Sequence, residues 1–188
     1  MVSDYRSLVD YLDSFTRQLG DFDLPFLHSL LAEEDDLGEI LDAYDAQMPL
    51  PVLRRSGSIQ GRGFLRLMQA MYPHQEMDAV GHWFGEGKAR WHYLPVYALC
   101  MKRLECENAD IERLYLFMVL RDQISAAIRL GVIGPMDGNV LQRNLYATCE
   151  SVRIASGDKR FNDAVKTCPV LELAQGYHDY IYSKLFQN

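Results

Sequence analysis

The chain has 188 residues, a length typical of one domain that buries a core without disulfide bonds or a structural metal. Its hydrophobic content of 48% excludes an intrinsically disordered chain, and no apolar run reaches the ~20 residues of a membrane-spanning helix. The net charge of −7 and the isoelectric point of about 5.2 exclude binding to nucleic-acid phosphates as the main activity.

The first third of the sequence has the periodicity of helices. Ser3 is a candidate N-cap for a helix whose apolar residues from Tyr5 to Leu19 recur at i, i+3, i+4 and i+7. Asp23 followed by Pro25 is typical of a cap and first turn, so a second helix is expected there. A third helix is predicted over residues 36–47.

Prolines divide the middle of the chain. Pro49 and Pro51 end the third helix and begin the next, which is expected to reach Tyr72. A short helix is predicted over residues 78–84, and a helix with Pro95 in its first turn is expected to end near Leu104.

The second half contains the most apolar helix. It is predicted to start at Asn108 or Asp110 and to end at Gly131, and it is apolar nearly all round, which is typical of a buried helix. A further helix is expected from about 137 to 155, and Pro169 opens a last one.

No segment alternates with the period of a strand, so the predicted fold is all-α. We expect a single-domain bundle of about eight to ten helices over residues 1–188, with residues 169–188 forming a C-terminal helix that docks partners. The four cysteines have no CxxC spacing and no signal segment follows Met1, so reduced thiols in a cytoplasmic protein are expected.

Charge is distributed unevenly. Residues 33–45 carry seven acids and no base, whereas residues 46–75 contain no acid and include four arginines: Arg54, Arg55, Arg62 and Arg66. This pattern suggests a docking surface for an acidic protein, although charge runs are more often solvated faces.

Glycines lie among these arginines. Gly57 and Gly61 form a small-xxx-small ledge, and each costs a helix about 1 kcal/mol relative to alanine. The ledge therefore predicts close approach of another backbone, either in the core or at an interface. The segment lacks the Lys-Ser/Thr ending of a phosphate loop, so a nucleotide site is not expected.

Two further features suggest partner contacts. Arg121, Asp122 and Arg129 interrupt the apolar helix, and unpaired charges are costly to bury. Four aromatic residues crowd the C-terminal helix, where tyrosines are common interface residues: Tyr177, Tyr180, Tyr182 and Phe186.

No catalytic motif is present, and no cofactor is expected. A competing interpretation is a helical metalloenzyme, with Asp78 and His82 on one helix face and His92 as a third ligand.

Several segments, in order, resemble the UreF family of urease accessory proteins. Residues 54–67 resemble its arginine-rich segment, and residues 125–131 resemble Ser-Ala-Ala-Val-Arg-Leu-Gly. Residues 134–138 are similar to Gly-Gln-Thr-Asp-Gly, and residues 182–186 to Tyr-Ser-Arg-Leu-Phe. Phe22-Asp23-Leu24-Pro25 is similar to a helix start of the family.

The resemblance implies a homodimeric, all-helical chaperone without catalytic activity of its own. It would bind a UreD/UreH-type partner and a UreG-type GTPase, and with them load nickel into apo-urease. A scaffold for another GTPase system is the other alternative. The expected partner-binding residues come from three segments: Arg54, Arg55, Arg62 and Arg66; Arg129, Gly134, Asp137 and Gly138; Tyr177, His178, Tyr182 and Phe186.

The chain departs from the family pattern at three places. The usual Gly-Gly-Phe segment near the start is absent, so a naturally short or cut chain is expected. Pro135-Met136 replaces a Gln-Thr pair, and Tyr177 replaces an arginine before the His-acid pair. These changes bear on which partner is recruited.

Overall fold

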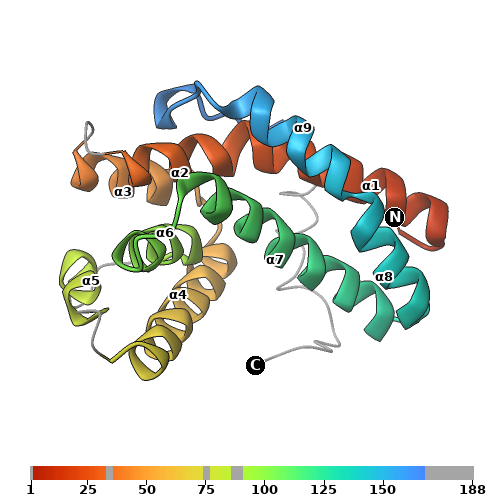
Figure 1. The fold of residues 1–188 in the computed structure, drawn as a ribbon, viewed down its shortest axis with the longest axis horizontal. Coiled ribbons are helices and arrows are strands. Elements are labelled where there is room, and N and C mark those ends of the chain that lie inside the picture. The colour runs from red at the N-terminus through yellow and green to blue at the C-terminus, as the bar shows by residue number, and fades with distance from the viewer. Residues whose placement is uncertain (1, 33–35, 74–76, 86–90, 168–188) are drawn as a thin grey trace. The chain divides into compact units, whose positions relative to one another are not determined.

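The computed structural model describes residues 2–32, 36–73, 77–85 and 91–167, and Figure 1 shows their helices. No strand occurs among these residues, so the all-α prediction is confirmed. None of the helices in these ranges is long and apolar enough to cross a membrane.

Backbone packing divides the chain into two compact units. Unit 1 contains the described residues up to 32 and residues 105–167, and unit 2 contains the described residues from 36 to 104. Each unit is described by itself. One domain over residues 1–188 stays a prediction.

Unit 1 is built from two stretches of chain that are distant in sequence. Its elements are α1 (Tyr5–Gln18), the π-helical turn η1 (Leu19–Asp23), α2 (Leu24–Leu31), α7 (Asn108–Arg129), α8 (Pro135–Asn144), α9 (Tyr146–Ser156) and the 3₁₀ turn η2 (Phe161–Asp163).

The start of α1 differs from the predicted one. Asp4, not Ser3, is the N-cap, and its carboxylate accepts from the Ser7 backbone N–H at 2.8 Å. The Ser7 hydroxyl in turn bonds the Asp4 backbone, which completes a capping box.

The predicted break at Asp23 is absent. Asp23 has helical dihedral angles and makes no cap bond; instead its buried carboxylate accepts from the Tyr115 hydroxyl at 2.9 Å. α1, η1 and α2 therefore form one continuous helical stretch. Likewise, Leu145 keeps helical angles between α8 and α9. Counted this way, the described residues form seven helices, slightly fewer than the predicted eight to ten.

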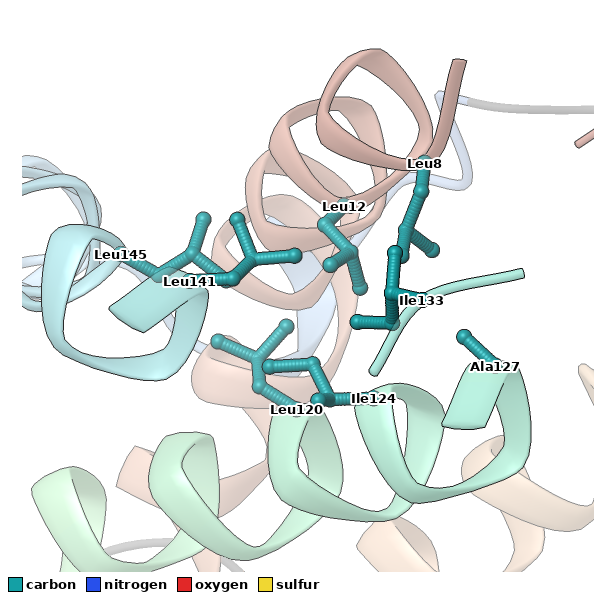
Figure 2. Close-up of a cluster of buried hydrophobic side chains, with 8 residues drawn as sticks. All are labelled: Leu8, Leu12, Leu120, Ile124, Ala127, Ile133, Leu141 and Leu145. Atoms are coloured by element: carbon teal, nitrogen blue, oxygen red, sulfur yellow. The ribbon is translucent and has the colours of Figure 1, made fainter. Parts of the chain in front are cut away.

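Leucine and isoleucine side chains form the core between α1, α7 and α8 (Figure 2). Ile133 joins this core from the turn between α7 and α8. The buried members are Leu8, Leu12, Leu120, Ile124, Ala127, Ile133, Leu141 and Leu145. Residues before, within and after the Arg129–Gly138 segment belong to this core, so the core fixes the position of that segment.

α7 is buried on one side only, which corrects the prediction of a helix buried all round. Leu116 and Leu120 are buried, whereas Phe117 is 48% exposed. On the next helices, Leu141 and Leu145 are buried, whereas Val140 and Tyr146 are exposed.

Unit 2 contains α3 (Leu37–Ala46), α4 (Pro51–Met71), α5 (Met77–Phe84) and α6 (Tyr93–Arg103). Asp36 caps α3 by accepting from the Glu39 backbone N–H at 3.0 Å. α4 packs against α6, with Leu65 and Met68 buried on one side and Tyr97 buried on the other.

Candidate partner-binding surfaces

One face of α4 presents arginines to solvent. Arg55, Arg62 and Arg66 are all exposed, and they lie within roughly 40° of one another at 100° per residue. The Arg62 guanidinium lies 5.3 Å from the centre of the Trp91 ring, a cation–π contact that holds it near the helix. The 21 residues of α4 include no acid, so this face is purely basic.

Arg54 is bonded within the protein instead. Its guanidinium lies 2.9 Å from the Asp45 carboxylate and donates to the Met48 carbonyl at 2.6 Å. The same carboxylate lies 2.9 Å from Nε2 of buried His92. Burial lowers the pKa of His92 below its usual value, and Asp45 opposes that shift only in part. Arg54 therefore has a structural task, whereas its three neighbours on α4 face solvent.

The glycine ledge of α4 receives another backbone, as the sequence predicts. The second backbone is the Trp91–His92 segment of the same unit. A Cβ on Gly61 would overlap the Trp91 carbonyl oxygen, and one on Gly57 would lie 2.7 Å from Nδ1 of His92. The close approach predicted for the ledge, in the core or at an interface, is therefore a packing contact within unit 2.

The Arg129–Gly138 segment joins α7 to α8 in unit 1. Arg129 is the exposed last residue of α7, and Gly134 is the N-cap of α8. Asp137 is exposed in the first turn of α8, where the helix dipole stabilises a negative charge. Gly138 is buried, and a Cβ there would lie 2.7 Å from Ile128. Gly138 is thus needed for packing.

The charged residues that interrupt the second half of α7 lie at the surface. Arg121 and Asp122 are both exposed, and their side chains bond each other at 3.1 Å. The C-terminal candidates Tyr177, His178, Tyr182 and Phe186 lie outside the described residues.

The UreF family matches residues 2–146. The chain belongs to the UreF family. It is 31% identical to urease accessory protein F of Arabidopsis thaliana over 170 residues, which cover 87% of this chain and 70% of the relative. It is 27% identical to urease accessory protein F of Oryza sativa subsp. indica over 193 residues, covering 99% of this chain and 73% of the relative.

These findings bear on the predictions from the sequence. The resemblance to the UreF family is confirmed, and so is the prediction of an accessory protein rather than an enzyme. The family match includes α4 and the Arg129–Gly138 segment of this UreF-family chain. The roles of individual residues in partner binding stay predictions.

The three residues of the metalloenzyme alternative have separate environments. Asp78 accepts from the Gln69 amide at 2.7 Å, His82 is exposed, and His92 is buried against Asp45. Among the described residues, no group of three histidine, cysteine or acidic side chains is placed to hold a metal ion.

Sequence reasoning missed a buried ion network in unit 1 of this UreF-family chain. Glu112 is only 8% exposed, and its carboxylate lies 3.4 Å from His28 Nε2 and 3.2 Å from the Arg153 guanidinium. Burial alone would raise the pKa of Glu112, but the bonds to His28 and Arg153 outweigh it and lower the pKa. The residues come from three helices, so no local pattern could reveal the network.

It also missed exposed apolar residues on α7 and α9. Leu114 and Phe117 share the solvent-facing side of α7 with Arg121, and Tyr146 stands beside them on α9. One signal in the sequence could have revealed this exposed face. Arg121 is a charged residue four positions after Phe117, so the two share a helix face, and a face that carries an arginine is expected to meet solvent.

Proposed function

We propose that this UreF-family chain is a non-catalytic scaffold that binds a UreD/UreH-type protein and a UreG-type GTPase in the cytoplasm. Together they insert nickel into apo-urease, and the scaffold itself works as a homodimer. The single observation that carries the proposal is family membership across residues 2–146. The names of the plant relatives, urease accessory protein F, support the same role.

The exposed arginines of α4 support a docking task. Arg55, Arg62 and Arg66 form no ion pair with other described residues, and the Arg62 guanidinium lies over the Trp91 ring. Exposed charges that do not stabilise the fold are free to attract an acidic partner and to speed its association. We therefore assign Arg55, Arg62 and Arg66 to a partner interface, and Arg54 to its structural support.

The Arg129–Gly138 segment supplies a second surface in this proposal. Arg129 and Asp137 are exposed at the junction of α7 and α8, while the buried Gly138 and Ile133 hold the junction in place. Rigid support of an exposed charged turn is what a specific contact needs. The C-terminal residues Tyr177, His178, Tyr182 and Phe186 are the third proposed surface.

The test is charge reversal on α4. The double variant Arg55→Glu with Arg62→Glu should weaken or abolish a partner complex in co-purification, because acids would then face acids. Arg6→Glu on α1 is the matched control, since Arg6 is also exposed and forms no ion pair with described residues. Loss of helicity in the double variant would show that these arginines are structural, and unchanged partner binding would remove α4 from the interface.

A further inference from the structure

The outer face of α4 carries two ridges of different chemistry. Side chains four residues apart form a ridge along a helix, and two such ridges lie next to each other on the solvent side of α4. One ridge contains the exposed Arg62 and Arg66. The members of its neighbour are also exposed, and they are Arg55, Ile59, Gly63, Leu67 and Met71. The second ridge is therefore mainly apolar and lies beside the arginines.

The large side chains of the apolar ridge are uncovered. Ile59 is 54% exposed, Leu67 is 53% exposed and Met71 is 57% exposed. From Ile59 to Met71 the helix rises about 18 Å at 1.5 Å per residue. Single exposed apolar residues are normal on a protein surface, whereas a row of them rimmed by charged residues marks an interaction site.

Gly63 interrupts the apolar ridge and leaves a notch in it. A Cβ there meets no atom within 4 Å, so packing inside the protein does not require a glycine. Gly63 lies within α4 and has no positive φ, so the backbone does not require one either. Glycine in a helix interior costs about 1 kcal/mol relative to alanine. Close approach of another backbone from outside accounts for a cost that the fold itself does not explain.

The charge beside the apolar ridge is positive. Arg55, Arg62 and Arg66 form no ion pair with described residues, and α4 contains no acid. Asp78 of α5 accepts from Gln69 at 2.7 Å, so one carboxylate lies near the end of the arginine ridge. One carboxylate against three guanidinium groups leaves the face positive. A partner with carboxylates beside an apolar stripe would complement it.

We propose that the outer face of α4 binds an acidic amphipathic helix of a partner protein. The apolar stripe of that helix packs on Ile59 and Leu67, and its backbone crosses α4 at the Gly63 notch. Its carboxylates, on one flank of the stripe, meet Arg62 and Arg66. The inference deepens the proposed function by naming the kind of segment that α4 receives. It rests on that function only for the claim that the chain acts by binding proteins.

Charge disfavours a second copy of this chain as the occupant. Two copies paired through α4 would bring three arginines of each copy to one interface, with one Asp78 carboxylate from each. Like charges facing each other across an interface cost several kcal/mol.

Charge also disfavours an anionic membrane. The chain has a net charge of −7, and an extended lipid surface meets the field of the whole molecule. A single helix seated on α4 meets mainly the charges within a Debye length of about 8–10 Å, which here are the arginines.

The test uses the full-length chain and two dye-labelled, helix-stapled peptides of about 14 residues, which span about 21 Å. Both carry the same leucine stripe; one has glutamates along one flank, and its twin has lysines there. Fluorescence anisotropy should show that the glutamate peptide binds at least about tenfold more tightly, a difference of about 1.4 kcal/mol. Arg55→Glu with Arg66→Glu should reverse this preference.

Gly63→Leu separates docking from folding. The position is open and leucine favours a helix more than glycine does, so helicity and Tm should be retained or raised. Because leucine fills the notch, the glutamate peptide should bind at least about tenfold more weakly. Ala155→Leu is the matched control, since it adds the same side chain to an exposed position on α9. Arg6→Glu is the charge control, and neither control should change the affinity.

Several results would overturn the inference. Absence of binding, equal affinity for the two peptides, or unchanged affinity in a folded Gly63→Leu would each do so. A wild-type dimer that Gly63→Leu turns into monomers in light scattering would assign the face to a second copy. Binding to phosphatidylserine vesicles that Arg55→Glu with Arg66→Glu abolishes would assign it to a lipid surface. Displacement of the glutamate peptide by a synthetic peptide of residues 168–188 would assign it to the chain's own C-terminal segment.

The peptides contain no urease component, so the two proposals fail separately. A chain that co-purifies with urease partners but binds neither peptide would refute the helix on α4 alone. A chain that prefers the glutamate peptide but recruits no urease partner would refute the proposed function alone.

Discussion

Replacing Gly61 with alanine tests the close contact between α4 and the Trp91–His92 segment. The new Cβ would overlap the Trp91 carbonyl oxygen and lie 3.0 Å from its carbonyl carbon. These are backbone atoms, so no change of rotamer relieves the overlap, and the two segments must separate. We take the upper end of overpacking costs, about 3 kcal/mol. Alanine's higher helix propensity returns about 1 kcal/mol, which leaves a net loss of about 2 kcal/mol.

Gly63 provides the matched control two residues along the same helix. A Cβ at Gly63 meets no atom within 4 Å. Gly63→Ala therefore has the gain in helix propensity without the overlap, and should stabilise the protein by about 1 kcal/mol. The two variants are chemically identical, so their difference of about 3 kcal/mol measures the contact itself.

Urea unfolding followed by circular dichroism measures both free energies, and thermal unfolding followed by the same signal measures Tm. For a chain of this size, Gly61→Ala should lower Tm by about 4–8 °C and Gly63→Ala should raise it by about 2–4 °C. Equal stability of the two variants, or a more stable Gly61→Ala, would refute the packing of α4 against the Trp91–His92 segment.

Three further predictions concern buried polar groups. Glu112→Ala should cost about 3 kcal/mol in urea unfolding, because it leaves the Arg153 guanidinium and the buried His28 ring without their carboxylate partner; Arg17→Ala, which removes an exposed ion pair, should change stability far less. Tyr115→Phe should cost about 1.5–3 kcal/mol by the same assay, since it deletes a buried bond to the Asp23 carboxylate. The free energy of unfolding should fall as pH drops from about 7.5 to about 5. In the folded protein the pKa of His92 is below its usual 6.5, so over this range the unfolded chain binds a proton at His92 more readily than the folded protein does. A further fall should follow below pH 4.5, as Glu112, whose pKa is also lowered, becomes protonated in the folded state; a flat profile over the upper window would contradict the burial of a neutral His92.

Element boundaries set by proline were predictable from sequence. Pro51 begins α4 and the helix ends at Met71, before Pro73, since proline lacks the N–H that a helix interior needs. The break predicted at Asp23 failed for a tertiary reason. Asp23 bonds Tyr115, a residue distant in sequence, so a local cap pattern was overruled by a contact that no local pattern contains.

The exposed side of α7 was not predictable from composition. A helix rich in leucine and phenylalanine resembles a buried one, but burial depends on whether neighbours cover each side. α1 and α8 cover Leu120 and Ile124, while Phe117 stays exposed.

The candidate site shows the same limit. Arg54 and Arg55 are adjacent and chemically identical, and only the position of Asp45 makes one structural and the other a solvent-facing charge.

Co-purification with UreD-type and UreG-type partners, followed by a urease activation assay with nickel, tests the central claim most directly. The account predicts a stable complex that restores urease activity, and a loss of both with Arg55→Glu and Arg62→Glu but not with Arg6→Glu. A folded chain that binds neither partner and leaves apo-urease inactive would contradict it.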